Sequence, residues 1–524
     1  MKHKAKRRPM LKALAAGSFV SIAGCSGNAS QGGTGENASQ GGTFRFSVPF
    51  FPPNLDPLQN DGGWRSREIG VLESLFEPNR DGGVDPQLVD DWSRSGDDLT
   101  WEFELRQDVN FHNGSDLAAD AVAFALDRTF FYDASRLSGL PVESIEAIDD
   151  RTVAITTESP MASLPGQLSR PSAGIIHPDS MTDDGSIEPI STGPFTLESW
   201  DPSGEIVIKR NDDYYGTNPA IERAVFEQVS DGQTRLLKLQ NDELDLGKNL
   251  PNSAAAEIEN DSSVDLHITE NASEQIIVFN TDRDPLDDQR VRRAILSGID
   301  RQAIVDSVLE GIGSPAYKPW DPASVQWANE KLDPDSYDPE LAASLLADAG
   351  WERGDDDVRY RNGDPLAVVL WAYTERPNLP AIAEVMQAQL SEIGFDIEVK
   401  VTEWSALDEA KTQGDYDMFI GHWGMYGYPP DPDILTNYYD PDQNIIDSPY
   451  DNQRVVDLLD EGRKMFDTDE RKQIYDEIQE IVMEDVPVGF LVRQSYVNGT
   501  QTDVDGYNPH PRIPKLELEQ ISDS

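Results

Sequence analysis

The chain has 524 residues, with 96 Asp and Glu against 43 Lys and Arg, so its formal net charge is −53 at pH 7. This acidity disfavours nucleic acid and anionic membrane surfaces as partners, because like charges repel. Hydrophobic residues make up 38% of the chain, which is enough for packed cores and excludes a disordered protein. The length predicts two or three domains.

Residues 1–24 have the order of an export signal. Residues 1–12 hold six Lys or Arg and no acid, and residues 13–24 are small and apolar. The pair Arg7-Arg8 is typical of a twin-arginine signal, which exports proteins that are already folded. The apolar run is too short for a membrane-spanning helix, which needs about 20 residues.

Cys25 is the only cysteine of the chain, so an intramolecular disulfide is excluded. It ends the run Ile22-Ala23-Gly24-Cys25, which resembles a bacterial-type lipobox, in which the cysteine becomes the lipidated first residue. The alternative is an incidental small apolar residue. We expect a protein that is lipid-anchored at the extracellular face of the cell membrane and touches the membrane through that anchor only.

Residues 25–42 are rich in Gly, Ser, Asn and Gln and predict a flexible tether. Removal of residues 1–24 takes away six of the 43 basic residues and leaves 37 against 96 acids, a net charge of −59. Salt shortens the screening length to about 3 Å at 1 M, so such a surface suits a halophile.

Hydrophobic periodicity predicts the elements of the folded body, which begins at Thr43. Alternation of apolar and polar residues predicts strands from Thr43 onward and at 99–105, Thr152–Thr157 and Glu205–Arg210. Helical spacing predicts helices at 117–130, 232–241, 286–298, 300–311 and 338–349.

Between 366 and 422 the expected elements alternate strictly in type. The predicted order is a strand at 366–373, a helix at 379–393 ended by Gly394, a strand at 395–401, a helix at 403–413 and a strand at 416–422. This βαβαβ order predicts a parallel sheet covered by helices. Ligands of such sheets bind at the carboxyl ends of the strands, which points to His422 onward. Helices at 451–466 and 468–485 and a strand at 486–492 follow.

Motifs of catalytic sites are absent from the sequence. None of the six histidines lies in an HExxH pattern or in a close cluster, so no metal site is expected. GxSxG, P-loop and GxGxxG patterns are absent as well. We therefore expect a protein that is not an enzyme and has no cofactor; a secreted hydrolase is the disfavoured alternative.

Four long stretches match one family. They begin with PQLVDDWSRSGDDLTWEF at 86, STGPFTLESW at 191, IIVFNTDRDP at 276 and YDPELAASLLADAGW at 337. These motifs, in order over residues 43–515, resemble the peptide- and nickel-type (family 5) extracellular solute-binding proteins of ABC importers, here as a haloarchaeal-like lipoprotein.

The resemblance implies an α/β fold with two lobes, similar to periplasmic binding proteins (type II, cluster C), with an extra subdomain in the first lobe. The expected parts are lobe I at 43–58, 188–272 and 487–524, the additional subdomain at 59–187 and lobe II at 273–486. Hinge closure would trap the ligand between the lobes.

The resemblance places the ligand at the loop that follows His422. Trp423, Tyr426 and Tyr428 offer flat apolar surfaces with polar edges, and ordinary packing is the alternative reading. Peptide binders of the family usually carry an aspartate three residues before the Asp-Pro turn, here Asp431-Pro432, where it pairs with the amino terminus of the ligand. Tyr428 stands at that position, which does not favour a dipeptide.

Arg170 lies in Ser169-Arg170-Pro171, which resembles the nickel-chelate binders, whose arginine before proline holds a carboxylate of the chelate. A guanidinium makes a bidentate contact with a carboxylate, and a surface ion pair is the alternative. Asn60, Trp64 and Arg65 match a ligand-facing stretch of the family.

Other conspicuous residues are expected to be structural. His112 lies in Phe111-His112-Asn113-Gly114, which predicts a tight turn after a strand, and Asp431-Pro432 predicts another turn. The arginines of the 286–298 helix are expected to pair with nearby acids on the helix surface; they are Arg290, Arg292 and Arg293.

The resemblance implies a monomeric receptor that hands a peptide or related small organic solute to the permease and ATPase subunits of an ABC importer. Two alternatives remain open. The ligand could be an anionic nickel or other metal chelate, or the protein could present its ligand to a chemoreceptor.

Overall fold

The computed structural model describes residues 42–59, 61–132, 135, 137–202, 204–320, 325–334, 336–423, 431–510 and 515–523, with the backbone alone at 271–273, 423 and 523. All of them belong to one compact unit, Gln40–Ser524. The lipidation site predicted at Cys25 lies outside the described residues.

The described residues form an 11-stranded mixed sheet in the order β18-β17-β19-β12-β20-β11-β1-β10-β9-β8, with β13 (Gly313–Pro315) paired to β20. Its parallel βαβαβ part confirms the prediction for 366–422. The elements are β17 (Ala367–Tyr373), α9 (Asn378–Glu392), β18 (Asp396–Thr402), α10 (Trp404–Thr412) and β19 (Met418–Trp423). Gly394 follows α9 with φ +104°, a conformation that favours glycine.

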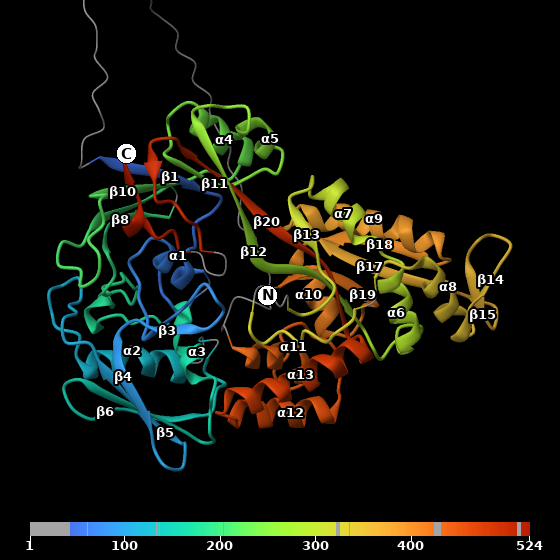
Figure 1. Cartoon of the computed structure of the whole chain (residues 1–524), viewed down its shortest axis with the longest axis horizontal. Helices are drawn as coiled ribbons and strands as arrows, with labels where there is room; N and C mark the ends of the chain where they lie inside the picture. Colours follow the sequence, from blue (N-terminus) through green and yellow to red (C-terminus); the bar gives the residue numbers. More distant parts are fainter. Residues whose placement is uncertain are drawn as a thin grey trace, which may run out of the picture. The chain divides into compact units, whose positions relative to one another are not determined.

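Two long antiparallel strands run between the two ends of the sheet (Figure 1). They are β12 (Val264–Phe279) and β20 (Val488–Gln501). β12 pairs with β19 near its carboxyl end, and β20 pairs with β11 (Leu246–Leu250). The register of β12 against β20 shifts between Glu270 and Glu274 and again between Gln275 and Ile276. Such shifts bend strands locally.

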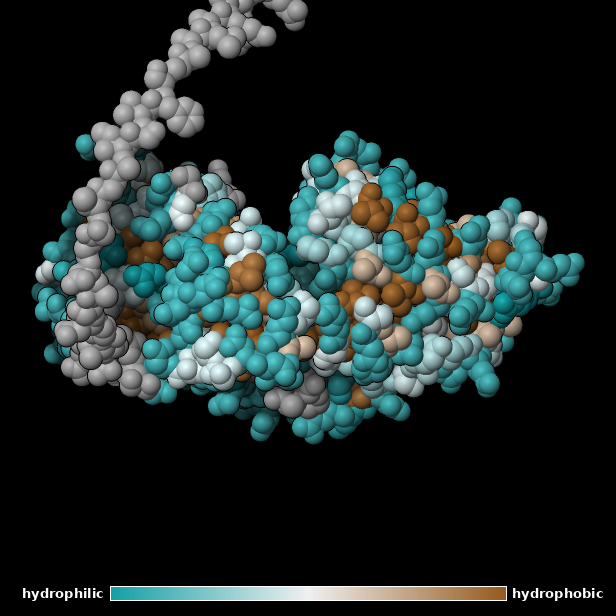
Figure 2. All heavy atoms as spheres, turned by 90° about the horizontal axis from the view of Figure 1, so that it is seen from above, coloured by the Kyte–Doolittle hydropathy of each residue, from teal (hydrophilic) through white to brown (hydrophobic). Residues whose placement is uncertain are grey.

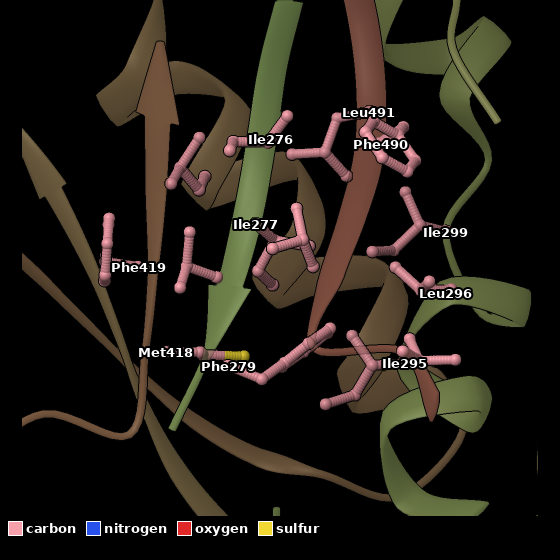
Figure 3. Close-up of a cluster of buried hydrophobic side chains, with 14 of the residues drawn as sticks. Ile276, Ile277, Phe279, Ile295, Leu296, Ile299, Met418, Phe419, Phe490 and Leu491 are labelled. Atoms are coloured by element: carbon pink, nitrogen blue, oxygen red, sulfur yellow. The ribbon is translucent and has the colours of Figure 1, made fainter. Parts of the chain in front are cut away.

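The largest hydrophobic core surrounds β12, β19 and β20 (Figure 3). Ile276, Ile277 and Phe279 of β12 lie between Met418 and Phe419 of β19 and Phe490 and Leu491 of β20, with Ile295, Leu296 and Ile299 at the side. Helices around this core are α6 (Gln289–Ser297), α7 (Arg301–Val308), α8 (Pro339–Asp348), α11 (Thr436–Tyr439), α12 (Gln453–Lys464) and α13 (Thr468–Asp485). A small antiparallel sheet joins β14 (Glu352–Arg353), β15 (Arg359–Arg361) and β16 (Asp364–Pro365).

The other end of the large sheet is built around β1 (Thr43–Val48), which is parallel to β10 and β11. β10 (Arg223–Gln228), β9 (Glu205–Arg210) and β8 (Phe195–Asp201) continue it antiparallel. The core of this part joins Phe44 and Phe46 near the start of the body to Leu516, Leu518 and Ile521 near its end. Residues after β20 add the short antiparallel pair β21 (Val504–Asp505) and β22 (Ser522–Asp523). A satellite core lies under α4 (Gly232–Gln240) and α5 (Ala254–Ile258).

A third core lies within residues 72–187. A four-stranded antiparallel sheet covers it, in the order β4 (Val89–Arg94), β5 (Thr100–Leu105), β7 (Thr152–Thr157) and β6 (Val142–Ala147). Further elements of this segment are α1 (Gly62–Glu68), β2 (Phe76–Pro78), β3 (Val84–Pro86), α2 (Ala119–Phe131), α3 (Leu164–Leu168) and η1 (Pro171–Ala173). We call residues 59–187 the inserted segment.

Two predicted structural roles have clear outcomes. His112 lies in a tight turn, as predicted: Gly114 N donates to Phe111 O at 2.8 Å, and the His112 ring contacts Gly193 O at 3.0 Å. The prediction for Arg292 is wrong. Its buried guanidinium donates to the carbonyls of Leu286, just before α6, and Val486, at the end of α13, at 2.6 and 2.9 Å, because packing has removed these carbonyls from water.

The face drawn in Figure 2 is mostly hydrophilic, with hydrophobic atoms in separate patches. Among the described residues, no helix combines the length and the apolar character that crossing a membrane requires.

Candidate functional site

The aromatic residues predicted to hold the ligand follow β19. Trp423 is the last residue of that strand, and its backbone pairs with Glu274 of β12. The Trp423 side chain, Tyr426 and Tyr428 lie outside the described part of the chain, as does Asn60. Their contact with a ligand stays a prediction, and the surrounding described residues define the site.

Polar side chains gather at the carboxyl ends of β17 and β19. Gln275 Nε2 lies 3.4 Å from His422 Nδ1 and 3.2 Å from Gln494 Oε1, so the three side chains form a row across neighbouring strands. Burial, followed by the charge of Arg376, lowers the pKa of His422 to about 3. The imidazole is therefore neutral near pH 7, and the exposed Arg376 supplies a positive charge at this edge of the sheet.

Arg376 is a residue that the sequence reasoning missed. It follows β17 by three residues, within Thr374-Glu375-Arg376-Pro377, and the same strand-end rule that pointed to His422 also applies to β17. The signal was therefore present in the sequence.

Glu274, the β12 residue that pairs with Trp423, forms a buried ion pair with Arg493. Arg493 Nε donates to Glu274 Oε1 at 2.9 Å, and both side chains are buried. Burial and the charge of Glu274 raise the pKa values of Tyr438 and Tyr439, so these phenols remain protonated. Because its carboxylate is engaged by Arg493, Glu274 is a structural charge of the strand pair.

The second group of predicted residues lies on α1 and beside η1, two elements that pack against each other. Arg65 is buried; it forms an ion pair with Glu68 and donates Nη2 to Phe50 O at 2.8 Å. Glu68 also forms an ion pair with Lys248, so two cations share one carboxylate. Trp64, on the same helix, is half-buried. The structure therefore brings Trp64 and Arg65 next to the segment that carries Arg170.

The backbone around Arg170 is firmly held. Arg67 Nη1 donates to Ser169 O at 2.6 Å, and Ser74 Oγ donates to Arg170 O at 3.3 Å. Arg170 itself caps η1 with extended backbone (φ −67°, ψ 147°), and its side chain is half-buried. A guanidinium on such a fixed backbone loses less freedom when it binds a carboxylate.

A side-chain hydrogen bond joins the region before Arg170 to the residues that follow the predicted aromatic loop. Ser163 Oγ, at the start of α3, donates to Asp433 Oδ2 at 3.1 Å, and Asp433 lies in η3 (Pro432–Leu435), just after the aromatic loop. Arg170 follows α3, seven residues after Ser163. The segment that carries Arg170 therefore lies close to η3.

The Asp431-Pro432 turn is structural, as predicted. The Asp431 side chain accepts from Asp433 N and caps η3. It also receives a bidentate pair of hydrogen bonds from Arg471, at 2.7 and 2.8 Å. These bonds use the lone pairs of the carboxylate that a ligand would need.

A cavity of about 450 Å³ lies elsewhere. Tyr416, Lys411 and Asp447 are among its lining residues, which places it beside the amino end of β19, whereas the predicted ligand residues follow the carboxyl end. The cavity is therefore separate from the candidate site. Within the described residues, no group of three or more His, Cys, Asp or Glu is arranged to hold a metal ion.

Comparison with known proteins decides the family. The model of the bacterial extracellular solute-binding proteins, family 5 (middle part), matches residues 83–445. The chain belongs to this family. Family 5 proteins are solute-binding components of ABC importers, and the family binds substrates rather than transforming them.

Relatives of this family 5 protein align with it over most of the length of both chains. It is 27% identical to the dipeptide-binding protein of Escherichia coli (strain K12) over 474 residues, which are 84% of this chain and 86% of the relative. It is 26% identical to the nickel-binding protein NikA of Staphylococcus aureus (strain NCTC 8325 / PS 47) over 494 residues, 94% of this chain and 95% of the relative.

A solved structure confirms the predicted fold class. The crystal structure of NikA from Brucella suis in complex with Fe(III)-EDTA aligns with a TM-score of 0.84 at 25% identity, covering 92% of this chain and 100% of NikA. The fold of this family 5 protein is therefore the α/β fold of periplasmic binding proteins of type II.

Proposed function

We propose that this family 5 protein is a lipid-anchored receptor at the extracellular face of the cell membrane. It captures a small organic solute that carries a carboxylate, a peptide or a related compound, and hands it intact to the permease and ATPase of an ABC importer. Cys25 carries the lipid, residues 25–42 form the tether, and the body works as a monomer.

The placement of arginines in an acidic chain supports an anionic ligand. Arg376 is exposed beyond β17, and Arg170 precedes η1, in a chain whose net charge is −53. A guanidinium offers two parallel donors to a carboxylate. Because the remaining surface repels anions, a solute carboxylate is held only where such cations are presented.

A peptide or related solute is the leading form of this ligand, supported by the similarity to a dipeptide-binding protein. Tyr428 replaces the aspartate that would hold a peptide amino terminus, so a ligand whose amino group is blocked or absent fits better. A metal chelate is the second form. Ser169-Arg170-Pro171 and the similarity to NikA with bound Fe(III)-EDTA, a polycarboxylate chelate, favour it.

The capture mechanism follows from the two long strands. We place the hinge in β12 and β20, because register shifts interrupt their ladder beside Glu274 and next to the row formed by Gln275, His422 and Gln494. Bending there brings the inserted segment with lobe I toward lobe II, and ligand contacts made only in the closed form shift the population to it.

Native mass spectrometry of the protein purified from its own cells in molar KCl tests this proposal. The expected result is a bound small acid whose mass identifies a peptide or a chelate. Calorimetry then compares a tetrapeptide, glutathione and Fe(III)-EDTA as probes. Cleavage of any peptide probe by the pure protein contradicts the receptor function.

The lipid anchor has a separate test. A Cys25→Ser variant is expected in the medium rather than in the membrane fraction, with an unchanged fold by circular dichroism. Equal membrane retention of both forms contradicts lipidation at Cys25.

A further inference from the structure

Adjacent residues of the turn between α12 and α13 pack against two different hydrophobic cores. This turn comprises Met465, Phe466 and Asp467, between Lys464 and Thr468. Met465 packs against the core around β12, β19 and β20, whereas Phe466 packs against the core of the inserted segment. A side chain of the second half of the chain thus completes a core whose other members, apart from Tyr215, lie within residues 72–190.

Two side chains of the inserted segment hold the Phe466 ring. The guanidinium carbon of Arg94 lies 3.6 Å from the ring centroid, and the Trp101 ring lies 5.9 Å away with a tilt of 55°. Arg94 and Trp101 are cross-strand partners on β4 and β5, and Arg94 also forms an ion pair with Asp98. The pocket for Phe466 is therefore built on a rigid ladder, and a cation–π contact adds to the apolar packing.

A polar contact lies beside this aromatic one. Ala162 N donates to Arg463 O at 2.7 Å, and Ser163 Oγ donates to Asp433 Oδ2 at 3.1 Å. Asp433 is nearly inaccessible and forms an ion pair with Arg463 at 3.2 Å. Arg463 also donates Nη2 to Thr436 Oγ1 at 3.0 Å. A buried carboxylate with this many partners fixes geometry, because each lost hydrogen bond leaves it partly unsatisfied.

We propose that these contacts form a clasp between the inserted segment and the α12–α13 region, which positions the segment that carries Arg170 relative to η3 without touching the ligand. We call the Phe466 contact and the Ser163–Asp433–Arg463 network together the clasp. Its polar part starts at Ser163, seven residues before Arg170, and ends at Asp433, three residues after the aromatic loop of 424–430. The clasp thus sets the separation of the segment that carries Arg170 from η3.

The clasp also biases the hinge. If β12 and β20 bend, Phe466 leaves its pocket and exposes more of its apolar ring to water, which opposes bending. The closed arrangement is therefore populated before any ligand arrives. A solute that enters then spends less of its binding free energy on closure.

Pulsed electron spin resonance on the ligand-free protein tests the clasp. Spin labels are placed at Glu146→Cys on β6 and Glu384→Cys on α9, two exposed positions, in the full chain with Cys25→Ser. Phe466→Ala is expected to lengthen or broaden the distance distribution by more than about 2 Å, a rearrangement larger than ordinary side-chain adjustment.

Matched variants separate positioning from general stability. Phe466→Trp keeps an aromatic ring and is expected to restore the wild-type distribution. Tyr337→Ala, which removes an exposed ring far from the clasp in sequence, should leave it unchanged. If Phe466→Ala does not fold, Arg94→Met and Ser163→Ala each weaken one part of the clasp and should broaden the distribution. Wild-type distributions in the folded clasp variants overturn the proposal. The clasp takes its hinge from the proposed function, but because no ligand is present this result does not depend on which solute the protein binds.

Discussion

Trp423 ends β19 beside the row of Gln275 and His422, at the edge of the sheet where ligands of parallel strands bind. Trp423→Ala is expected to weaken ligand binding by about 2 kcal/mol, because aromatic anchors often contribute that much. Calorimetry with the solute identified by mass spectrometry measures the change. An unchanged affinity rejects the assignment of this loop to the site.

Arg170 is expected to act through the shape of its guanidinium. Arg170→Lys keeps the charge but loses the planar pair of donors, so we expect about tenfold weaker binding of a carboxylate solute. Arg283→Lys is the matched control, since Arg283 pairs with Asp415 and Asp417 beside the separate cavity. Equal affinity of Arg170→Lys and wild type argues against a bidentate contact.

Glu73 is a buried carboxyl outside the candidate site. It accepts hydrogen bonds from Thr192 Oγ1 at 2.7 Å, Tyr214 Oη at 2.8 Å and Tyr215 Oη at 3.1 Å. Burial raises its pKa to about 7, although these hydrogen bonds and Lys515 favour the charged form. A raised pKa means that the folded protein holds a proton that the unfolded chain releases above pH 4.5.

The stability contributed by Glu73 is therefore present below pH 4.5 and lost as the pH rises to about 7. The loss is about 3 kcal/mol over this range, at 1.36 kcal/mol per pKa unit. The free energy of unfolding of wild type relative to Glu73→Gln should fall by that amount, measured by denaturant unfolding at several pH values in high salt. Glu143→Gln, at an exposed position, serves as control. Parallel profiles of wild type and Glu73→Gln contradict the shift.

At the scale of elements, the buried pair of Glu274 and Arg493 makes β12 and β20 sensitive to single changes. Arg493→Met leaves a buried carboxylate without its cation and is expected to destabilise the fold by about 3–5 kcal/mol. The double variant Glu274→Gln, Arg493→Met should recover much of this loss, because an amide needs no counter-charge. Denaturant midpoints of the three proteins check this; a double variant no more stable than the single one contradicts it.

Local periodicity was sufficient to predict most elements. The strands Thr152–Thr157 and Glu205–Arg210 and the helix Thr468–Asp485 have the predicted limits, because their apolar spacing changes sharply at both ends. β20 was predicted to end at 492 but runs to Gln501. Its second half is polar yet buried, and Gly499 allows Leu239 to pack closely, so the reason for burial lies in a distant segment.

The candidate site could be predicted only in part, because some of its contacts come from segments far apart in the chain. The strand-end rule led to His422 from sequence order alone, and it applies equally to Arg376. The neighbours of His422 could not be found in this way, because Gln275 and Gln494 reach it through antiparallel pairing of segments far apart in the chain. Arg65 was predicted to face ligand; it instead forms a buried ion pair with Glu68 one helical turn away, and the distant Lys248 joins the same carboxylate.

At the scale of the whole molecule, charge governs stability. With 96 acidic and 43 basic residues, repulsion opposes folding in dilute salt. Raising KCl from about 0.1 M to 1 M shortens the screening length from about 10 Å to about 3 Å, so the unfolding temperature should rise by several degrees. Sucrose of equal osmolality is the control for exclusion effects. A midpoint that is independent of KCl contradicts a halophilic design.

The core around β1 draws on both extremities of the polypeptide, since Phe44 and Phe46 meet Leu516, Leu518 and Ile521 there. Residues as late as Ile521 must be synthesised before this core can be sealed, so the core around β1 is completed late in folding.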